Sequence, residues 1–348
     1  MSRVLLLGAG GFLGRHIGAA LAGHTDLRSP TRAQCDLVRM DLPELTALVA
    51  RERPDVVVSA AGQIVGSGLD FVRAHVVTTA KLVEAVAVAA PRARLVRIGS
   101  AAEYGVVPHG LAVAEDHPAA PVSEYGLSHL AATRLAELAG DTGRLDTIVL
   151  RVFNPVGPGM PAGNMLARVT AMVRAAAADG AGDLALGLHD TYRDLVDVRD
   201  VAAAVLAATR CAAPTQRVVN VGSGRAVATR DVVRLLADVA GFPGEIRPGG
   251  FPPDATRSAA VPWMCADLDR ARRVLGWTPV HDLTESLRAL WAADGVRPTD
   301  PAADGVRPTG PAADGVRPTR PATDGVWPTG PAADGARPTR PVAGVAAG

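Results

Sequence analysis

Short runs of consecutive apolar residues alternate, along the first half of the chain, with longer segments in which apolar residues recur every three or four positions. Such runs are typical of parallel strands buried on both faces, and the longer period is typical of helices that cover a sheet. The runs occupy residues 4–7, 26–31, 55–59, 95–100 and 147–152. Helices are predicted over residues 13–21, 43–53, 69–90 and 123–139. This alternation predicts an α/β fold with a doubly wound parallel sheet.

A glycine-rich turn joins the first strand to the first helix. Its glycines follow a G-x-x-G-x-x-G spacing, with an extra glycine at Gly10. In Rossmann-type folds such glycines permit a sharp turn, close approach of the backbone to a dinucleotide pyrophosphate and close packing of helix on strand. The free N–H groups of the helix N-terminus then face the phosphates. We therefore predict a Rossmann-type dinucleotide site that includes Gly8, Gly11, Phe12, Leu13 and Gly14.

Three further segments are expected to contact the same cofactor. Arg28 and Arg32 lie near the end of the second predicted strand, where folds that prefer NAD carry an acid. An arginine there can pair with a 2′-phosphate, which mildly favours NADP(H) over NAD(H), although a solvated loop arginine is the alternative interpretation. The remaining predicted contacts are Asp36, Leu37, Ala60, Ala61 and Gly62.

The second half of the chain is less regular. Its predicted elements are a helix over residues 165–178, a short strand near Leu184, and segments 192–200, 217–221, 230–240 and 268–275. We interpret residues 1–160 as the dinucleotide-binding domain, with segments near 190–222 returning to it, and residues 161–291 mainly as a smaller substrate-binding lid. From residue 292 a ten-residue unit rich in proline and glycine recurs five times, which predicts a disordered tail.

Composition excludes several classes of function. The net charge of +1 offers no electrostatic basis for binding nucleic acid or an acidic membrane surface, and no apolar run is long enough to span a bilayer. Cys35, Cys211 and Cys265 have no metal-ligand spacing and need not pair, so we expect no metal site and a cytoplasmic protein.

Candidate chemistry gathers at the carboxyl ends of the strands, where doubly wound sheets bind ligands. Ser100 ends the fourth run. Tyr125 and His129 are four residues apart on a predicted helix and therefore share a face.

Over residues 3–291 the chain resembles the extended short-chain dehydrogenase/reductases, in the NAD-dependent epimerase/dehydratase branch that acts on nucleotide sugars. The resemblance rests on the glycine turn, on Tyr125 and on five later blocks. These are Gly99-Ser100-Ala101-Ala102-Glu103-Tyr104-Gly105, Arg151-x-Phe153-Asn154-Pro155-Val156-Gly157-Pro158-Gly159, Arg193-Asp194-x-x-Asp197-Val198-x-Asp200, Asn220-Val221-Gly222-Ser223-Gly224 and Leu275-Gly276-Trp277-x-Pro279. Two of the blocks look most like reductases of nucleotide-bound 4-keto-6-deoxyhexoses.

The resemblance implies roles for these residues. Tyr125 would transfer a proton while hydride moves to or from the nicotinamide, and Ser100 would hold the substrate oxygen. Asn154, Arg193 and Arg257 would bind the nucleotide sugar, Arg193 at its pyrophosphate. A homodimer is compatible with the family.

The chain departs from the family pattern at His129, because the family carries Tyr-x-x-x-Lys. That lysine lowers the tyrosine pKa and holds the nicotinamide ribose. Histidine has a free pKa of about 6.5, so we expect His129 to bind the ribose hydroxyls and to act as a pH-dependent substitute. Slow oxidation and relatively favoured reduction would follow. His75 likewise stands where the family usually has asparagine.

Other absences narrow the reaction. The family's dehydratases carry Asp-Glu directly after the position of Ser100, its decarboxylases a glutamate at the position of Ala102, and its 3,5-epimerase/reductases a cysteine there. This chain has Ala101-Ala102. We therefore expect 4-keto reduction, ahead of C4 epimerisation. The alternative from another class is a catalytically silent dinucleotide-binding scaffold or sensor.

The tail provides a first prediction. Deleting residues from Ala292 onward should leave the melting temperature and the cofactor affinity nearly unchanged, since the repeats offer little apolar surface to bury. Thermal unfolding and cofactor titration of the truncated chain measure both. A drop of many degrees would show that the repeats pack on the core.

Overall fold

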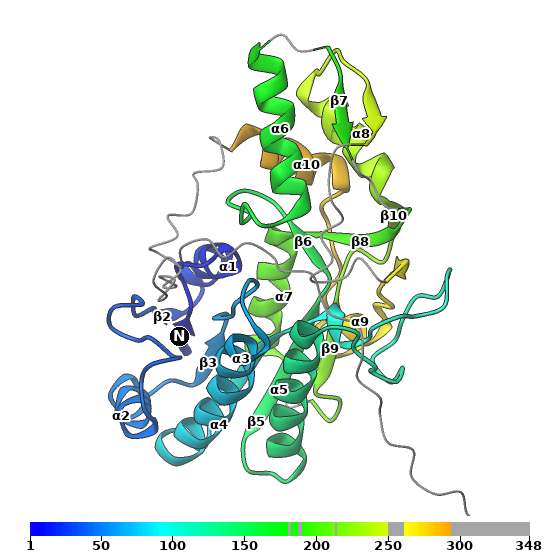
Figure 1. Cartoon of the computed structure of the whole chain (residues 1–348). Coiled ribbons are helices and arrows are strands. Elements are labelled where there is room, and N and C mark those ends of the chain that lie inside the picture. The colour runs from blue at the N-terminus through cyan, green and yellow to red at the C-terminus, as the bar shows by residue number, and fades with distance from the viewer. Residues whose placement is uncertain (180–181, 187–189, 213, 250–260, 294–348) are drawn as a thin grey trace, which may run out of the picture.

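The computed structural model describes residues 1–179, 182–186, 190–212, 214–249 and 261–293 (Figure 1). Arg257 and most of the repeat segment lie outside the described residues.

A six-stranded parallel sheet organises the molecule. Its order is β2-β1-β3-β4-β5-β9. The strands are β1 (Arg3–Leu7), β2 (Asp26–Arg28), β3 (Val56–Ser59), β4 (Arg94–Ser100), β5 (Asp146–Val152) and β9 (Val218–Val221). The prediction of a doubly wound, Rossmann-type sheet is confirmed. The strand β2 lies on one side of β1 and β3 on the other, so the order in which strands are added to the sheet reverses beside β1. Ligands of such sheets bind at this topological switch point.

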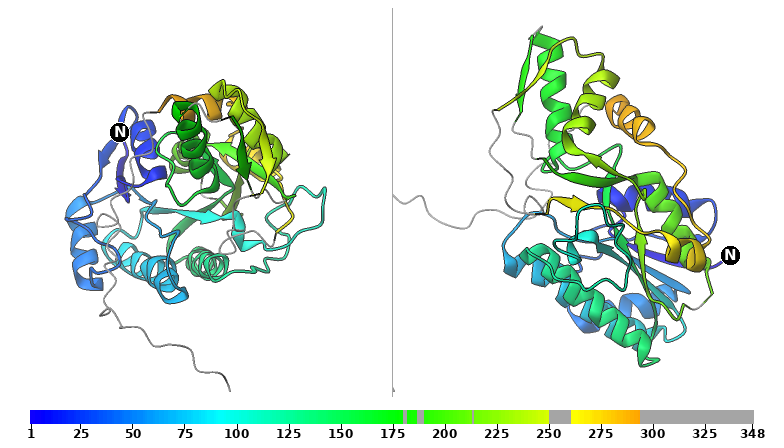
Figure 2. Two further views of the ribbon diagram at one scale, coloured as in Figure 1. Left: turned by 45° about the horizontal axis from the view of Figure 1, so that its top comes forward. Right: turned by 90° about the vertical axis from the view of Figure 1, so that its right-hand side faces the viewer.

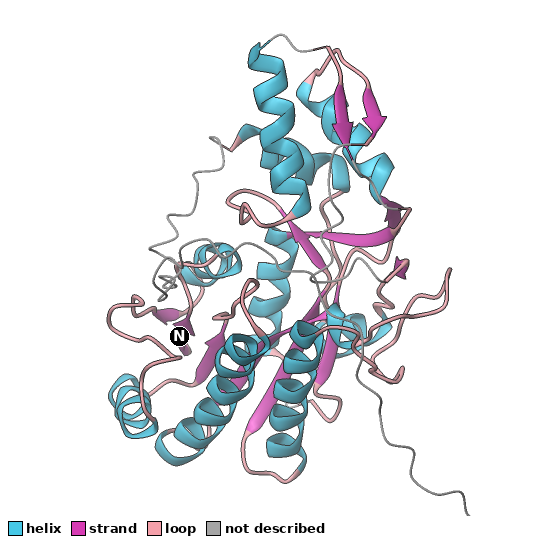
Figure 3. Ribbon diagram, viewed as in Figure 1, coloured by secondary structure: helices cyan, strands magenta, loops and turns pink. Residues whose placement is uncertain are grey.

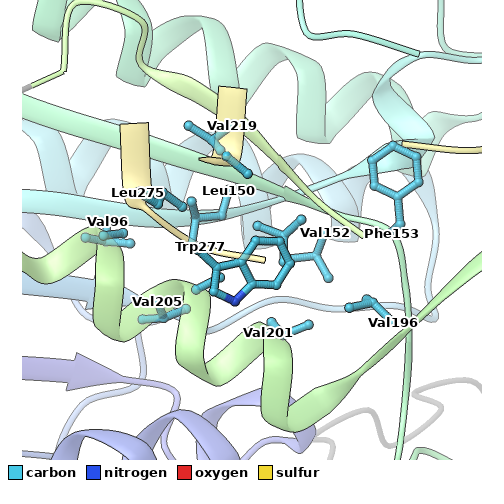
Figure 4. Close-up of a cluster of buried hydrophobic side chains, with 14 of the residues drawn as sticks. Val96, Leu150, Val152, Phe153, Val196, Val201, Val205, Val219, Leu275 and Trp277 are labelled. Atoms are coloured by element: carbon cyan, nitrogen blue, oxygen red, sulfur yellow. The ribbon is translucent and has the colours of Figure 1, made fainter. Parts of the chain in front are cut away.

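Helices cover both faces of this sheet (Figure 2). The helices α1 (Phe12–Ala22) and α7 (Val198–Arg210) pack together on one face. On the other face lie α2 (Leu42–Glu52), α4 (Thr78–Ala89) and α5 (Glu124–Asp141). The core beside α7 includes Trp277, which lies among valine and leucine side chains and donates from Nε1 to the Asp200 carbonyl at 3.1 Å (Figure 4).

A second region carries its own apolar core. It contains α6 (Met165–Asp179), α8 (Thr229–Ala240), α10 (Leu283–Ala292) and the paired strands β7 (Leu184–Leu186) and β11 (Ile246–Pro248) (Figure 3). A small sheet, β10 (Ala226–Ala228)–β8 (Tyr192–Asp197)–β12 (Trp263–Met264), has β6 (Asn154–Val156) paired to β8. The helix α9 (Asp269–Leu275) precedes Trp277.

Several elements differ from those expected. The long helix predicted over residues 69–90 is divided into α3 (Gly68–Phe71), a π-helical segment η1 (Val72–Val77) and α4. The hydroxyl of Thr78 donates to the carbonyl of Arg73, five residues earlier, which fits the wider π turn. The helices α7 and α10 and the strand β6 were not predicted from the sequence. Asp197 and Asp282 cap the two helices, a signal that was present in the sequence.

The end of α10 refines the truncation experiment. Arg174 lies over the Trp291 ring, 4.3 Å from its centre, and donates to the carbonyls of Trp291 and Ala293, the latter at 3.1 Å. A deletion that starts at Ala292 removes one of these contacts, so the chain is better cut after Ala293. Within the described ranges, no helix is long and apolar enough to cross a membrane.

Candidate active site

The glycine turn is packed against the loop that follows β3. Gly8 has a φ of +89°, and a Cβ there would lie 2.6 Å from the Ala61 nitrogen. A Cβ on Gly14 would lie 1.9 Å from the Gly8 carbonyl oxygen, so helix and strand approach too closely for a side chain. The structure thus brings the two predicted cofactor segments, the glycine turn and Ala60–Gly62, side by side at the topological switch point of the sheet.

The N-terminus of α1 has the features of an anion site. Gly11 is the N-cap, and no side chain caps the helix. A Cβ on Gly11 would meet only the Gly8 carbonyl oxygen, at 3.4 Å, so the approach to this backbone is open on the protein's side. Phe12 and Leu13 form the first turn. These observations fit a dinucleotide pyrophosphate placed on the helix N-terminus.

The arginines expected to read the adenosine ribose are paired on the surface. The strand β2 ends at Arg28 and not at residue 31, because Pro30 has no N–H to continue the ladder. Arg28 lies 3.2 Å from Asp26, and Arg32 lies 3.5 Å from Asp36. Exposed pairs of this kind contribute little to stability, so a phosphate can compete for either arginine. Leu37 is fixed nearby, since Lys81 donates to its carbonyl at 2.6 Å.

Ser100 ends β4 in a tightly bonded turn. Its Oγ accepts from the Ala102 N–H at 3.2 Å, which leaves the hydroxyl hydrogen to be donated. A Cβ on Gly126 would lie 2.4 Å from the Ala102 carbonyl oxygen, so the first turn of α5 is seated on this turn. The turn is the short helix η2 (Ala101–Glu103). The structure therefore packs the start of α5, which carries Tyr125, against the turn that begins at Ser100.

A buried ion pair lies beneath that turn. Glu103 is fully buried, and its Oε2 accepts from Nε of Arg151 at 2.8 Å. Its Oε1 accepts from the Ser100 N–H at 3.0 Å and from the Thr133 hydroxyl at 2.9 Å. Gly99 makes room for this carboxylate, because a Cβ there would lie 2.8 Å from Oε1. Glu103 is thus a structural anchor of the turn.

The rings of Tyr125, His129 and His75 pack against one another beside the turn. The Tyr125 ring centre lies 4.6 Å from that of His129 and 5.6 Å from that of His75, and the two imidazole centres are 4.1 Å apart. His75 accepts at Nε2 from the Gln63 N–H at 3.2 Å. Its Nδ1 contacts the Ser128 hydroxyl at 2.8 Å, and that hydroxyl donates to the Tyr125 carbonyl.

The proton positions of His75 follow from these partners. Since the hydroxyl hydrogen of Ser128 is used, Ser128 accepts and the His75 proton lies on Nδ1. Burial, helped by the charge of Arg97, lowers the pKa of His75 to about 4. His75 is therefore a neutral bridge between the Gly62–Gln63 loop and α5.

His129 is buried and neutral. Burial holds its pKa well below the ordinary value, and His75 and the charge of Arg97 act in the same direction. Its Nδ1 lies 3.3 Å from Nη2 of Arg97 on β4. The expectation that His129 changes charge near neutral pH is therefore wrong, because a cation already lies beside it and water is excluded.

Asn154 and Arg193 lie on one face of the small sheet. Asn154 is the register partner of Leu195, two residues after Arg193, so their side chains point the same way. Asn154 donates to the Asp194 carbonyl at 2.8 Å. Burial lowers the pKa of Arg193 to about 10, which leaves it a cation at neutral pH. Asp194 itself faces inward and accepts from the backbones of Ser223, Gly224 and Ala266.

Neither Arg97 nor Thr133 was predicted from the sequence to belong to the site. The anchoring role of Glu103 and Arg151 was also not predicted. A signal was present, since each arginine interrupts an otherwise apolar strand and a buried charge requires partners. Within the described part of the chain, no group of three or more His, Cys, Asp or Glu side chains could hold a metal ion.

Comparison with known proteins identifies the family and relatives of the chain. Residues 4–222 match the model of the NAD dependent epimerase/dehydratase family. A dTDP-6-deoxy-L-talose 4-dehydrogenase (NAD(P)(+)) of Kitasatospora kifunensis is 41% identical over 317 residues, covering 85% of this chain and 97% of the relative. A UDP-glucose 4-epimerase of Azospirillum brasilense is 31% identical over 318 residues, covering 82% and 89%.

A solved structure shares the fold over nearly its whole length. RMD from Pseudomonas aeruginosa, complexed with NADPH, superposes with a TM-score of 0.73 at 28% identity, covering 84% of this chain and 98% of that one.

The geometry of the turn predicts different effects for substitutions at Gly14, Gly10 and Gly11. Gly14→Ala should lower the free energy of unfolding by about 2–3 kcal/mol, because its Cβ must displace backbone. Gly10→Ala is the matched control, since a Cβ there meets nothing within 4 Å. Gly11→Ala should keep the melting temperature and weaken dinucleotide binding. Thermal unfolding and cofactor titration test all three, and equal melting temperatures for the Gly14 and Gly10 variants would contradict this account.

Proposed function

We propose, since the chain belongs to the NAD dependent epimerase/dehydratase family, that it is an NAD(P)-dependent oxidoreductase that reduces the 4-keto group of a nucleotide-linked 6-deoxyhexose. A dTDP-linked sugar is the first candidate, because the 41% identical relative is a dTDP-6-deoxy-L-talose 4-dehydrogenase. Reduction at C4 is the reverse of the reaction in that relative's name.

The observation that carries this proposal is the lack of a second acid or base after Ser100. Positions 101 and 102 are alanines. The only acid of that block, Glu103, is fully buried and held by Arg151, Thr133 and the Ser100 N–H, so it has no route to a substrate. Elimination, decarboxylation and C3 or C5 epimerisation each need such a group. Exchange of one hydride and one proton at C4 does not.

Each site residue has a part in this reaction. The nicotinamide, when bound, supplies or takes the hydride. The Tyr125 hydroxyl donates the proton to the C4 oxygen, and the free hydroxyl hydrogen of Ser100 donates a hydrogen bond to the same oxygen. His129 donates to the nicotinamide ribose. The cofactor segments at the glycine turn, Asp36–Leu37 and Ala60–Gly62 hold the dinucleotide, with Arg32 at its adenosine end.

The nucleotide sugar has a counterpart in the small sheet. Arg193, a partly buried cation near Asn154, is the group we assign to the pyrophosphate, and Asn154 keeps an amide oxygen and one N–H for the sugar. For the expected homodimer, exposed apolar side chains are present on neighbouring helices, Val88 on α4 and Leu127 and Leu138 on α5.

A substrate panel tests the proposal. The purified chain is supplied with dTDP-, GDP- and UDP-linked 4-keto-6-deoxyhexoses and with NADPH or NADH, and separately with a UDP-hexose and the oxidised cofactor. Nicotinamide absorbance and product configuration are measured in each case. We expect consumption of reduced cofactor with at least one 4-keto sugar, and loss of at least a thousandfold in Tyr125→Phe. C4 epimerisation of a UDP-hexose without net cofactor consumption would favour the epimerase, the second candidate. Binding without turnover would favour the sensor.

Cofactor choice gives a further prediction. NADP(H) should bind at least as tightly as NAD(H), and Arg32→Ala should weaken NADP(H) about tenfold while NAD(H) changes little, since a charged hydrogen bond is worth about 1.5 kcal/mol or more. Fluorescence titration measures both. Arg51→Ala, an exposed arginine on α2, is the control. A clear preference for NAD(H) that Arg32→Ala leaves unchanged would refute the assignment.

A further inference from the structure

A second buried arginine, Arg97, lies beside the histidines of the site. Arg97 is in the middle of β4, only 4% exposed, and its side chain faces α4 and α5. It donates from Nε to the Thr79 hydroxyl at 3.1 Å, from Nη1 to the Thr133 hydroxyl at 3.2 Å and from Nη2 to Nδ1 of His129 at 3.3 Å. Among the described residues, these three acceptors are all uncharged. Because neutral partners do not neutralise its charge, the buried guanidinium can act electrostatically on the groups around it.

The neighbouring charges do not cancel it. Glu103 is reached only through Thr133, whose hydroxyl accepts from Arg97 and donates to the carboxylate. The other oxygen of Glu103 is paired with Arg151. Two arginines thus share one carboxylate, and the group carries a net positive charge. The other titratable side chains that face Arg97 and His129 are His75 from η1, which is neutral, and Tyr125 from α5.

The contact with Arg97 also fixes the proton of His129. A guanidinium has donors and no acceptor, so Nδ1 of His129 accepts. A neutral imidazole carries one proton, which is then on Nε2. His129 is consequently held as an N–H donor by the arginine behind it. The family's lysine combines a cation and a donor in one ammonium group.

We propose that Arg97 is a positioning residue which, through His129, replaces the missing lysine: the buried guanidinium supplies the positive charge that stabilises the deprotonated form of Tyr125, and His129 supplies the donor. The inference rests on the proposed function only for the role of Tyr125 as the proton donor. Arg97 touches neither substrate nor cofactor in this arrangement.

The charge of Arg97 and His129 together is constant through the neutral pH range, in which the charge of a histidine with an ordinary pKa would change. Burial lowers the pKa of Arg97 to about 10, opposed by the charges of Glu103 and Tyr125, so the guanidinium remains protonated near neutrality. The tyrosine therefore experiences the same neighbouring charge throughout the neutral range.

The ionisation of Tyr125 tests the proposal directly. The chain has three tyrosines, so ring-labelled tyrosine NMR of the full-length protein, with and without NADP(H), resolves each one, and Tyr125→Phe assigns the signal. Arg97→Gln should raise the pKa of Tyr125 by about one unit or more, the usual effect of losing an opposite charge nearby. Arg94→Gln is the matched control, because Arg94 is also buried on β4 but pairs with Asp146. It should leave the pKa of Tyr125 unchanged.

A second arm tests whether the two residues act together. In the native protein His129→Lys should gain little, because the new ammonium faces the Arg97 guanidinium. In the Arg97→Gln protein the same His129→Lys change should restore the lower pKa of Tyr125 and recover activity lost at neutral pH. This reversal is a coupling that a merely structural role of Arg97 would not produce.

The outcomes that overturn the proposal are distinct from those that overturn the function. An unchanged pKa of Tyr125 in Arg97→Gln, an equal shift in Arg94→Gln, or additive effects in the double variant would each refute it. If Arg97→Gln does not fold, Arg97→Met replaces it, and the loss of the charge and of the donors should raise the pKa of Tyr125 and release the fixed proton of His129. An unchanged His129 proton would refute the proposal. The measurements of the Tyr125 pKa and of the His129 proton need no substrate, so a negative substrate panel leaves them interpretable.

Discussion

The buried pairing of Glu103 with Arg151 is the interaction on which the rest of the site depends. Burying ions costs free energy that only good geometry returns, and removing one partner of such a pair costs about 3–5 kcal/mol. The carboxylate occupies the space that a side chain at Gly99 would fill, and it fixes the turn at Ser100. The first turn of α5 is then seated on that turn. The positions of Ser100 and Tyr125 follow from one ion pair between η2 and β5.

The same network determines the charge at the site. The second arginine of the network, Arg97, extends from β4 toward α5. Its guanidinium makes protonation of the His129 imidazole unfavourable. A histidine at position 129 is therefore compatible with an active site in this family only as a neutral group. A cation one residue layer deeper acts at greater distance than an ammonium in contact, so its effect on Tyr125 should be smaller but insensitive to pH.

Much of the fold could be predicted from local patterns, because buried parallel strands and the glycine turn leave strong signals over few residues. The apolar runs located β1, β3, β4 and β5, and the spacing of Gly8, Gly11 and Gly14 located the tight turn between β1 and α1. The alanine-rich helix α7 was missed, since its apolar stripe is weak in bulk. The state of His129 was beyond sequence reasoning, because it depends on Arg97, distant in sequence, and on the exclusion of water. Arg97 itself was detectable as a charge within a buried strand.

The protonation of His129 tests the central claim most directly. Nitrogen NMR of the histidine-labelled protein follows both ring nitrogens through the pH range in which the chain stays folded. The account predicts a neutral ring with its proton on Nε2 throughout the neutral range, and loss of that single tautomer in Arg97→Met, which has no donor at this position. A protonation midpoint near the ordinary value of 6.5, or a proton on Nδ1, would contradict it.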